Sequence, residues 1–387
     1  MKGFQFSIPV KIYFGIGKLG IIGQISKAFG PKVMLILGSV SMEKEKVAAQ
    51  VIALLESEGL KVEKFGGIET NPRIEKIMEG AEIAKKFKPT AIIGLGGGSV
   101  IDTAKAISLA VTHDGDLWEY RISGKLGMER IENKLIPIIT IPTAFGTGSE
   151  VTPATVISQY KSKEVIVSPY MFPKVAVIDP SLSVSLSPEL TSKIGIDAFV
   201  QGMEAFVSTN ANAMSDLFAL EATKLAFTYL PKCVSDGRDL ESRSMIALSA
   251  LYGGLSIILA GVGAVHALAA PLSARYNIHH GHAVSILLLE VMKYNLDACA
   301  PRFARLAEAL GVDIKGMKEN EAADEAIART RLLLEELKLY PHQKLRELGV
   351  KKQDLEILAK GSFNPDMETN PKKMSTREIV SIFRNVL

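Results

Sequence analysis

The stretch A-I-I-G-L-G-G-G-S-V-I-D-T-A-K, residues 91–105, decides the fold. It opens with a continuous apolar run, Ala91–Leu95, which is typical of a β-strand buried on both faces. The turn Gly96–Ser99 follows, and a helical pattern then continues through Asp102. Backbone amides in such a turn, at the start of a helix, can approach a phosphate closely. We therefore predict a parallel α/β sheet with a phosphate-binding loop; a tight turn that serves packing alone is the alternative.

Strand and helix patterns alternate outward from this stretch. Strands are predicted at Val10–Phe14, Val33–Leu37, Val62–Phe65, Leu135–Ile141 and Val175–Ile178. A helix is predicted over Arg73–Phe87, after the start signal Asn71-Pro72. Strands separated by helices of this length indicate βαβ units and a parallel sheet.

Beyond Asp179-Pro180 the pattern becomes helical. The predicted helices are Pro188–Val207, Ala213–Tyr229, Leu240–Leu259, Ala283–Leu296, Pro301–Leu310, Asn320–Leu337, Lys352–Ala359 and Thr376–Arg384. The most apolar stretch, Ala247–Ala274, is interpreted as a buried helix followed by the histidine segment. His266 is expected late in a helical region. We predict an α/β domain over residues 1–182 and an all-helical domain over residues 183–387.

Composition narrows the class of protein. A chain of 387 residues usually forms two domains, and 47% hydrophobic with 22% charged residues is ordinary for a soluble globular protein. The net charge of +3, without a Lys/Arg block, argues against a nucleic-acid partner. The sequence contains no run of about 18 apolar residues, so no membrane span is expected. Two cysteines, Cys233 and Cys299, cannot form a disulfide framework, and the first residues carry no secretory signal, so a cytoplasmic protein is expected.

Two other loops are candidates for cofactor binding. The loop after Ile141 contains Thr143 and Thr147, whose hydroxyls suit phosphate or amide contacts; a polar surface turn is the alternative. The predicted strand ending at Leu37 is followed by Gly38 and Ser39, without the carboxylate that would bond a ribose 2′-OH and repel a 2′-phosphate. NADP(H) is therefore favoured over NAD(H), the alternative being an NAD site that reads the ribose through backbone groups.

A dinucleotide-like pattern, Gly15-x-Gly17-x-x-Gly20, also occurs near the N-terminus. It lacks an acidic residue at the tip of the next strand, where such a fingerprint requires one. A turn after the first strand explains it equally well.

Four of the six histidines fall within Gly263–His282. Asp197 and Gln201 are spaced i, i+4 on a predicted helix and so share one face. Together with His266 and His280 they form a ligand set that leaves a position open for substrate, although most lone histidines are structural. His279 and His282 are interpreted as neighbours of the site, and His113 and His342 as surface residues.

Together these motifs resemble the iron-dependent, group III alcohol dehydrogenase family over nearly the full length of the chain. The matching segments are F-G-I-G (14–17), N-P (71–72), G-G-G-S-V-I-D-T-A-K (96–105), I-P-T-A-F-G-T-G-S-E-V-T (141–152), G-I-D-A-F-V-Q-G-M-E-A (195–205) and V-H-A-L-A-A-P-L-S-A-R-Y-N-I-H-H-G (265–281). The resemblance implies a Rossmann-like N-terminal domain and a helical C-terminal domain, as in dehydroquinate synthase-like folds. It also implies a homodimer or higher homo-oligomer that transfers a hydride between NAD(P)(H) and a small alcohol, aldehyde or ketone.

The resemblance assigns roles to individual residues. The implied metal ligands are Asp197, Gln201, His266 and His280, of which Asp197, His266 and His280 act in catalysis through the metal. Fe²⁺ is the expected ion, with Zn²⁺ or Mn²⁺ as alternatives. The implied cofactor contacts are Gly38, Ser39, Asn71, Gly96, Gly97, Gly98, Ser99, Asp102, Thr143 and Thr147.

Two positions depart from the family pattern. Many members have His at the position of Gln201, whose neutral, harder oxygen is a weaker donor and softens the preference for Fe²⁺. Many members also have His at the position of Ala270, so proton transfer here must use water, the ribose hydroxyl or another side chain. These departures leave rival interpretations open: a glycerol- or diol-dehydrogenase-like enzyme, a sugar-phosphate cyclase, or a keto-acid reductase with weak or no metal. Arg275 would pair with the acidic substrate of such a reductase; a surface or interface position is the alternative for this residue. A cofactor-binding sensor without activity is the non-enzymatic alternative.

Overall fold

The computed structural model describes residues 2–39, 42–132, 134–341 and 343–387. Contacts between Cα atoms divide the chain into two units. One unit is Ser7–Ser185, and the other is Leu186–Leu387 together with the N-terminal residues up to Phe6.

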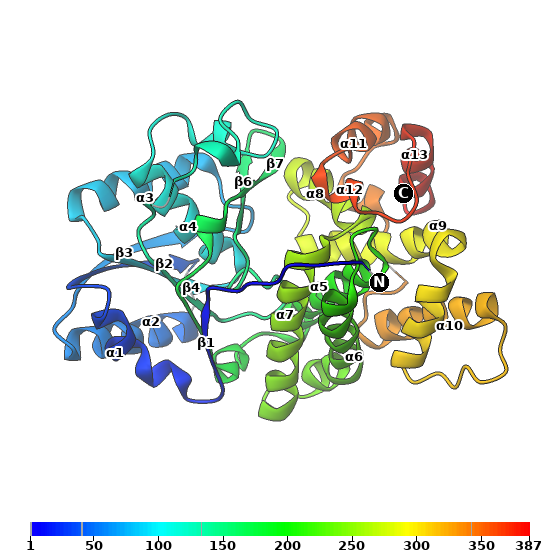
Figure 1. Cartoon of the computed structure of the whole chain (residues 1–387), viewed down its shortest axis with the longest axis horizontal. Helices are drawn as coiled ribbons and strands as arrows, with labels where there is room; N and C mark the ends of the chain where they lie inside the picture. Colours follow the sequence, from blue (N-terminus) through cyan, green and yellow to red (C-terminus); the bar gives the residue numbers. More distant parts are fainter. Residues whose placement is uncertain (1, 40–41, 133, 342) are drawn as a thin grey trace. The chain divides into compact units, whose positions relative to one another are not determined.

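Among the described residues, six strands form one parallel sheet in the first unit (Figure 1). Their order is β1 (Lys11–Phe14), β8 (Val175–Ile178), β5 (Ile138–Pro142), β4 (Ala91–Gly96), β2 (Lys32–Gly38) and β3 (Lys61–Ile68). The predicted parallel sheet is therefore confirmed.

Helices cover both faces of this sheet, α1 and α2 on one and α3 and α4 on the other (Figure 1). Side chains alternate accordingly along β2: Met34 and Ile36 join one core, and Val33 and Leu35 join the other. Burial on both faces explains why the strands are continuous apolar runs. The helices are α1 (Ile22–Lys27), α2 (Met42–Ser57), α3 (Ile74–Phe87), α4 (Gly98–Thr112) and the short η1 (Lys18–Ile21), η2 (Leu117–Tyr120), η3 (Met128–Arg130), η4 (Pro169–Met171) and η5 (Pro180–Ser183).

A two-stranded antiparallel hairpin, β6 (Ala154–Gln159) and β7 (Ser162–Val167), also belongs to this unit and was not predicted. It turns at Tyr160, whose φ of 53° is of the positive kind that two-residue hairpin turns require. The hairpin packs against α4, so it is part of the support for the glycine-rich loop.

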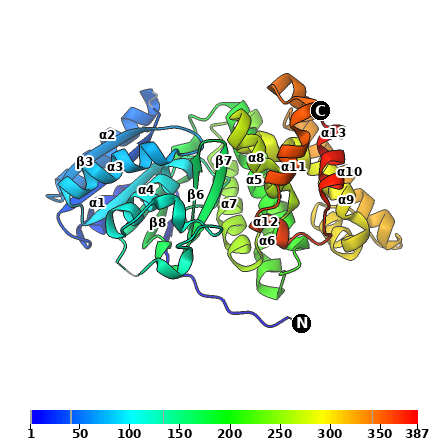
Figure 2. The ribbon, with the colours of Figure 1, turned by 90° about the horizontal axis from the view of Figure 1, so that it is seen from above.

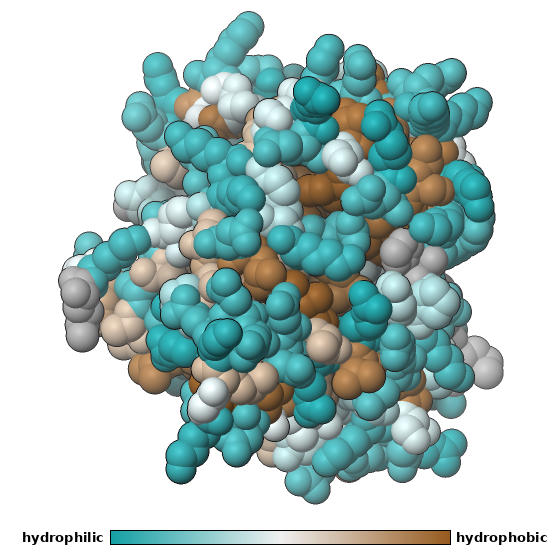
Figure 3. Space-filling model, turned by 90° about the vertical axis from the view of Figure 1, so that its right-hand side faces the viewer, coloured by the Kyte–Doolittle hydropathy of each residue, from teal (hydrophilic) through white to brown (hydrophobic). Residues whose placement is uncertain are grey.

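The second unit is helical, as predicted. Its elements are α5 (Pro188–Val207), α6 (Ala213–Ser235), α7 (Leu240–Ala260), α8 (Ala264–Tyr276), α9 (His280–Ala309), α10 (Glu319–Glu336), η6 (Leu345–Leu348), η7 (Lys352–Asp354), α11 (Leu355–Gly361), α12 (Pro365–Glu368) and α13 (Thr376–Asn385). The surface on the side of α9, α10 and α13 is mostly hydrophilic, with apolar residues between the polar ones (Figure 3). The two helices predicted at Ala283–Leu296 and Pro301–Leu310 correspond to the two parts of α9, which are separated by a kink at Cys299, where the backbone is not helical.

Helix α5 is the centre of the helical unit, and α6, α7 and α9 pack against it (Figure 2). Small residues make these approaches close. A Cβ on Gly202 would lie 2.7 Å from the carbonyl oxygen of Ala219, and one on Gly253 would lie 3.0 Å from Gln201 Oε1. Every residue from Gly195 to Val207 is buried, so polar side chains on this stretch lie in the interior.

Helix α7 is, among the described residues, the one helix long and apolar enough to cross a membrane by length and composition. However, 61% of its most apolar window is buried within the protein. Its packing against α5 and α6 is that of a core helix.

The predicted position of His266 late in a helical region is wrong. Helix α7 ends at Ala260 because Gly261, with φ of 72°, leaves the helical conformation. A separate helix, α8, starts at Ala264, and His266 is in its first turn.

Candidate metal and cofactor sites

Three predicted ligands converge in the helical unit. One donor atom from each of Asp197, His266 and His280 lies within 4.8 Å of the other two. Asp197 Oδ1 is 3.3 Å from His266 Nε2 and 3.7 Å from His280 Nε2. Asp197 and His266 are buried, and His280 is about one-quarter exposed, with 26% of its side chain accessible. The group is therefore closed on one side and accessible on another, as an open metal site requires.

Three different helices supply these side chains. Asp197 lies in the middle of α5, His266 in the first turn of α8, and His280 is the first residue of α9. Gly281 sets the approach of α9 to α5, because a Cβ there would lie 1.5 Å from the carbonyl oxygen of Lys193. The start of α9 thus meets the α5 backbone one turn before Asp197, and this contact places His280 beside the carboxylate.

Gln201 is part of the same buried group. Its Nε2 donates to Asp197 Oδ2 at 3.4 Å, and its Oε1 faces Gly253 of α7. Rotation of the Gln side-chain amide by 180° about χ3 exchanges the positions of its oxygen and its nitrogen. Gln201 therefore has the reach of a fourth ligand, and metal ligation requires the orientation with Oε1 toward Asp197.

The electrostatics of this group suit a cation. Glu204, one turn after Gln201 on α5, lies with Oε2 2.5 Å from His266 Nδ1. Burial lowers the pKa of His266, but the carboxylates of Glu204 and Asp197 outweigh it and raise the pKa to about 10. The field that holds a proton on this imidazole also favours a divalent ion, which competes with the proton for Nε2. Two carboxylates with imidazole and amide donors therefore fit a divalent metal of the iron or zinc type. We call Asp197, Gln201, Glu204, His266 and His280 the Asp197 cluster.

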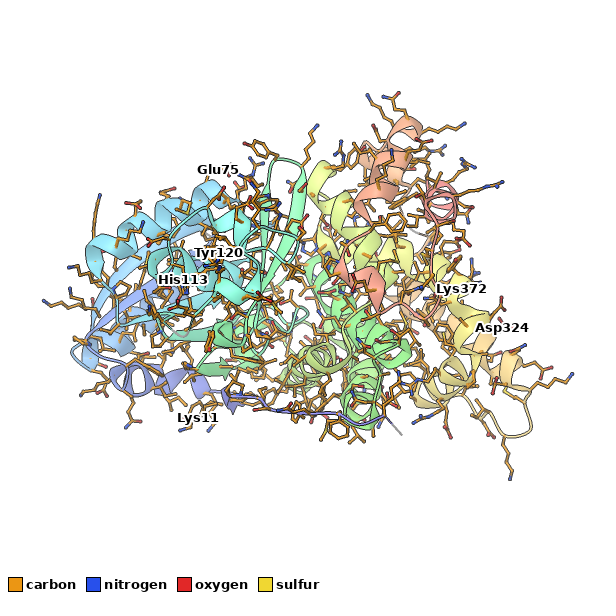
Figure 4. All side chains as sticks on the ribbon, turned by 45° about the horizontal axis from the view of Figure 1, so that its top comes forward. Lys11, Glu75, His113, Tyr120, Asp324 and Lys372 are labelled. Carbon is orange, nitrogen blue, oxygen red and sulfur yellow. The ribbon has the colours of Figure 1, made fainter. Side chains whose placement is uncertain are left out.

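The remaining histidines lie outside the converging donor group. His279 is the N-cap residue of α9 and His282 lies in its first turn, and both are half-buried. The surface position predicted for His113 is wrong: His113 is half-buried, accepts a hydrogen bond from Glu132 N at 2.9 Å and packs on the edge of Tyr120 (Figure 4). His342 lies outside the described residues.

The glycine-rich loop joins β4 to α4, as predicted. Gly97 is the N-cap residue of α4, so the free amides of the first turn lie at this end. A Cβ on Gly96 would lie 2.6 Å from Val100 Cγ2, and one on Gly98 would lie 2.7 Å from Thr147 Oγ1. Glycine therefore allows close packing at Gly96 and Gly98. Tight packing and phosphate binding are compatible explanations for the same glycine residues.

The ends of neighbouring strands bring the other predicted cofactor residues to one edge of the sheet. Gly96 pairs with Pro142, directly before Thr143, and Leu37, directly before Gly38, pairs with Leu95. Thr143 N donates to Gly96 O at 3.0 Å. The loops after parallel strands are where α/β sheets bind ligands, and the predicted contacts of Ser39, Asn71, Ser99 and Thr147 remain predictions.

Behind this loop lies a second buried charged group, here called the Lys105 cluster: Asp102, Lys105, Ser149 and Glu150. Lys105 Nζ contacts three carbonyl oxygens and one hydroxyl, those of Ser149 O (2.7 Å), Ser149 Oγ (3.0 Å), Thr152 O (2.9 Å) and Ala154 O (2.8 Å). Asp102, predicted as a cofactor contact, accepts from Ser149 Oγ at 2.6 Å and from Val156 N at 3.2 Å. Through these two hydrogen bonds the Asp102 carboxylate holds the segment from Ser149 to Val156 against α4.

Burial shifts the pKa values of this cluster. It lowers the pKa of Lys105 to about 8 and raises that of Glu150 to about 7. It also raises the pKa of Asp102, against the opposing effects of Lys105 and Ser149. Among the described residues Glu150 Oε1 has no hydrogen-bond partner, which is consistent with a carboxyl group that resists ionisation.

Sequence reasoning missed three important residues. Glu204 stands three residues after Gln201, a spacing that places it on the same helical face, and this signal was available. Lys105 and Gly281 gave no such signal, because their roles depend on carbonyl groups 44 or more residues away along the chain.

Comparisons with known proteins agree with these observations. A family model described as iron-containing alcohol dehydrogenase matches residues 9–180, and the C-terminal model of the Fe-containing alcohol dehydrogenase family matches residues 191–387. The chain is 33% identical to a 1,3-propanediol dehydrogenase of Klebsiella pneumoniae, covering 98% of each, and 32% identical to an NAD-dependent methanol dehydrogenase of Bacillus methanolicus, covering 99% of this chain and all of that one. A crystal structure of a 1,3-propanediol oxidoreductase superposes with a TM-score of 0.94 at 32% identity over the full length of both chains. The chain belongs to the iron-containing alcohol dehydrogenase family and is a metal-dependent oxidoreductase that transfers a hydride between a nicotinamide cofactor and a small alcohol or carbonyl compound.

Proposed function

We propose that this enzyme interconverts short alcohols or diols with their aldehydes or ketones, and that Asp197, Gln201, His266 and His280 hold its metal. The convergence of donor atoms from Asp197, His266 and His280 within 4.8 Å carries the proposal. The names of two relatives, a 1,3-propanediol dehydrogenase and a methanol dehydrogenase, support a short alcohol as substrate.

The residues of the Asp197 cluster have distinct tasks in this proposal. A bound divalent metal supplies Lewis acidity, which lowers the pKa of an alcohol or polarises a carbonyl group. Asp197 contributes negative charge, and His266 and His280 contribute neutral nitrogen donors from α8 and α9. The partly exposed side chain of His280 marks the side from which a small substrate would enter.

Ala270 bears on the route of the proton. It follows His266 by one turn of α8 and is half-buried. Its methyl group cannot accept a proton, so we propose that water carries the alcohol proton away from this position.

The glycine-rich loop is proposed to hold the cofactor pyrophosphate. The amides at the start of α4 and the positive end of its dipole face this loop. The nicotinamide cofactor supplies the hydride acceptor or donor. A preference for NADP(H) over NAD(H) stays a prediction: it rests on Gly38 and Ser39, which put no carboxylate at the ribose, whereas the methanol dehydrogenase relative is NAD-dependent by name.

Assembly and compartment also stay predictions. The resemblance favours a homodimer or higher homo-oligomer, and the cysteine usage favours the cytoplasm. Size-exclusion chromatography with light scattering tests the first of these.

One experiment tests the proposed function as a whole. The purified protein is stripped with a chelator, reloaded with Fe²⁺, Zn²⁺ or Mn²⁺, and assayed with NADH and NADPH over short alcohols, diols, aldehydes and keto acids. We expect no turnover after stripping and recovery with at least one metal on short alcohols or aldehydes. Full activity in metal-free protein contradicts the metal site, activity confined to keto acids contradicts the substrate class, and nucleotide binding without turnover contradicts the enzyme.

A further inference from the structure

Glu204 is a buried carboxylate that the known chemistry of the site leaves without a role. It lies on α5 with 3% of its surface exposed, seven residues after Asp197. Residues spaced by seven share one face of a helix. The carboxylate is therefore directed toward the same interior region as the predicted ligands.

Both oxygens of Glu204 are used by the start of α8. Oε1 accepts from Val265 N at 2.6 Å, and Oε2 lies 2.5 Å from His266 Nδ1. Amides at a helix N-terminus lack partners within the helix and attract negative charge. Glu204 thus binds the backbone of α8 and the imidazole that α8 carries.

Gly263 makes this contact possible. It is the N-cap residue of α8, and a Cβ there would lie 2.9 Å from Glu204 Oε1 and 3.3 Å from Asn370 Oδ1. Asn370 Oδ1 in turn accepts from Ala264 N at 3.2 Å. Two side chains therefore hold the first two amides of α8, and Glu204 is the one that also reaches the ring.

The contact determines which nitrogen of His266 can bind a metal. Since a carboxylate only accepts, Nδ1 must carry a hydrogen, so Nε2 is the nitrogen at which a metal can replace the proton. Nε2 is the atom that lies 3.3 Å from Asp197 Oδ1. A carboxylate behind a ligating imidazole also makes the imidazole a stronger donor.

We propose that Glu204 is a positioning residue for the metal ligand His266: it holds the Nδ1–H tautomer, fixes the ring orientation and strengthens Nε2 as a donor. This inference rests on the proposed metal site. It extends that site to a residue outside the ligand set. It also explains why a glycine suits position 263, because a Cβ there would approach the Glu204 carboxylate.

The test compares Glu204→Gln, Glu204→Asp and the matched control Glu189→Gln, which lies on the same helix with 75% of its side chain exposed. Zn²⁺ and Mn²⁺ affinities are measured by chelator competition, and the His266 ring nitrogen that keeps its hydrogen is identified from ¹⁵N NMR shifts of the Zn²⁺-loaded protein. We expect Glu204→Gln to weaken metal binding by about 10–100-fold and to let the tautomers mix, while Glu189→Gln matches the wild type in both. Glu204→Asp, which keeps the charge with a shorter reach, is expected to lie between them and serves if Glu204→Gln does not fold.

The two hypotheses fail in different ways. Metal affinity within about twofold of the wild type, with the tautomer unchanged in a folded Glu204→Gln protein, overturns the positioning role while leaving the metal site intact. A wild-type protein that binds neither ion overturns the proposed metal site itself, and the positioning of a metal ligand with it.

Discussion

The two units of the molecule each bury a group of charged side chains on their innermost helix, but the two groups are balanced differently. The Lys105 cluster on α4 contains its own cation, which is surrounded by carbonyl oxygens of one loop. The Asp197 cluster on α5 sets two carboxylates against imidazoles and an amide. In the Lys105 cluster the positive charge is a fixed part of the chain, whereas in the Asp197 cluster it is a proton on His266 that a divalent ion can replace. The Asp197 cluster is therefore the one suited to a metal ion.

We expect the largest effect on metal binding and turnover from Asp197→Asn, which removes one of the two negative charges of the Asp197 cluster. The amide keeps the shape of the side chain but loses the charge that faces His266 and His280. We expect metal content to fall below detection and turnover to fall by ~10³-fold or more, beyond the ~10–100-fold that follows from loss of a group behind a ligand. Metal analysis and the rate of NAD(P)H formation measure both. Thermal unfolding controls for the fold, and a metal content equal to that of the wild type would contradict the role of Asp197.

Gly281→Ala tests whether backbone contact assembles the Asp197 cluster. The new Cβ would lie 1.5 Å from Lys193 O, so the start of α9 must move away from α5 and carry His280 with it. We expect a loss of about 3 kcal/mol in the free energy of unfolding together with weaker metal binding. Gly20→Ala is the control, because nothing lies within 4 Å of a Cβ at that position. Equal melting temperatures for Gly281→Ala and the wild type would show that the close contact is not required.

The Lys105 cluster should respond to pH through Glu150. Burial raises the pKa of Glu150 from 4.5 to about 7, so the protonated form is favoured in the folded state. This contribution to stability is complete below pH 4.5 and is lost as the pH rises through 7, by up to about 3 kcal/mol. Urea unfolding of the wild type and Glu150→Gln between pH 4.5 and 8 measures it. The variant should show a flatter dependence, and parallel curves would rule out Glu150 as the source.

A smaller gain is expected from Gln201→His, which replaces the weakest donor of the Asp197 cluster. An imidazole binds Fe²⁺ or Zn²⁺ more strongly than an amide oxygen. We expect metal retention to rise by roughly tenfold, or about 1.4 kcal/mol. Metal occupancy during dialysis against a chelator is the measurement, and occupancy that decays at the wild-type rate would exclude Gln201 from the ligand set.

Regular elements could be predicted because their signals are local. The strand Ala91–Leu95 is found as β4, Ala91–Gly96, and the predicted helix Pro188–Val207 has the same bounds as α5. Continuous apolar runs and helical periods depend on neighbours within a few residues. The hairpin strands Ala154–Gln159 and Ser162–Val167 were missed, since neither shows a strict alternation of buried and exposed residues. Helix α8 was also missing from the predicted helices, although Gly261 separates it from α7.

The sequence by itself determined the two kinds of architecture, the glycine-rich loop at the end of β4, and the face that Asp197 and Gln201 share on α5. Periodicity and residue chemistry suffice for these features. The tertiary structure decided that His266 and His280 meet Asp197, that Glu204 lies behind His266, and that Lys105 holds the loop beyond Ser149. Those contacts join residues 44 to 83 positions apart, and they depend on backbones approaching closely at glycines such as Gly263 and Gly281. Local preferences carry no information on such distances, so close packing of the helices had to supply it.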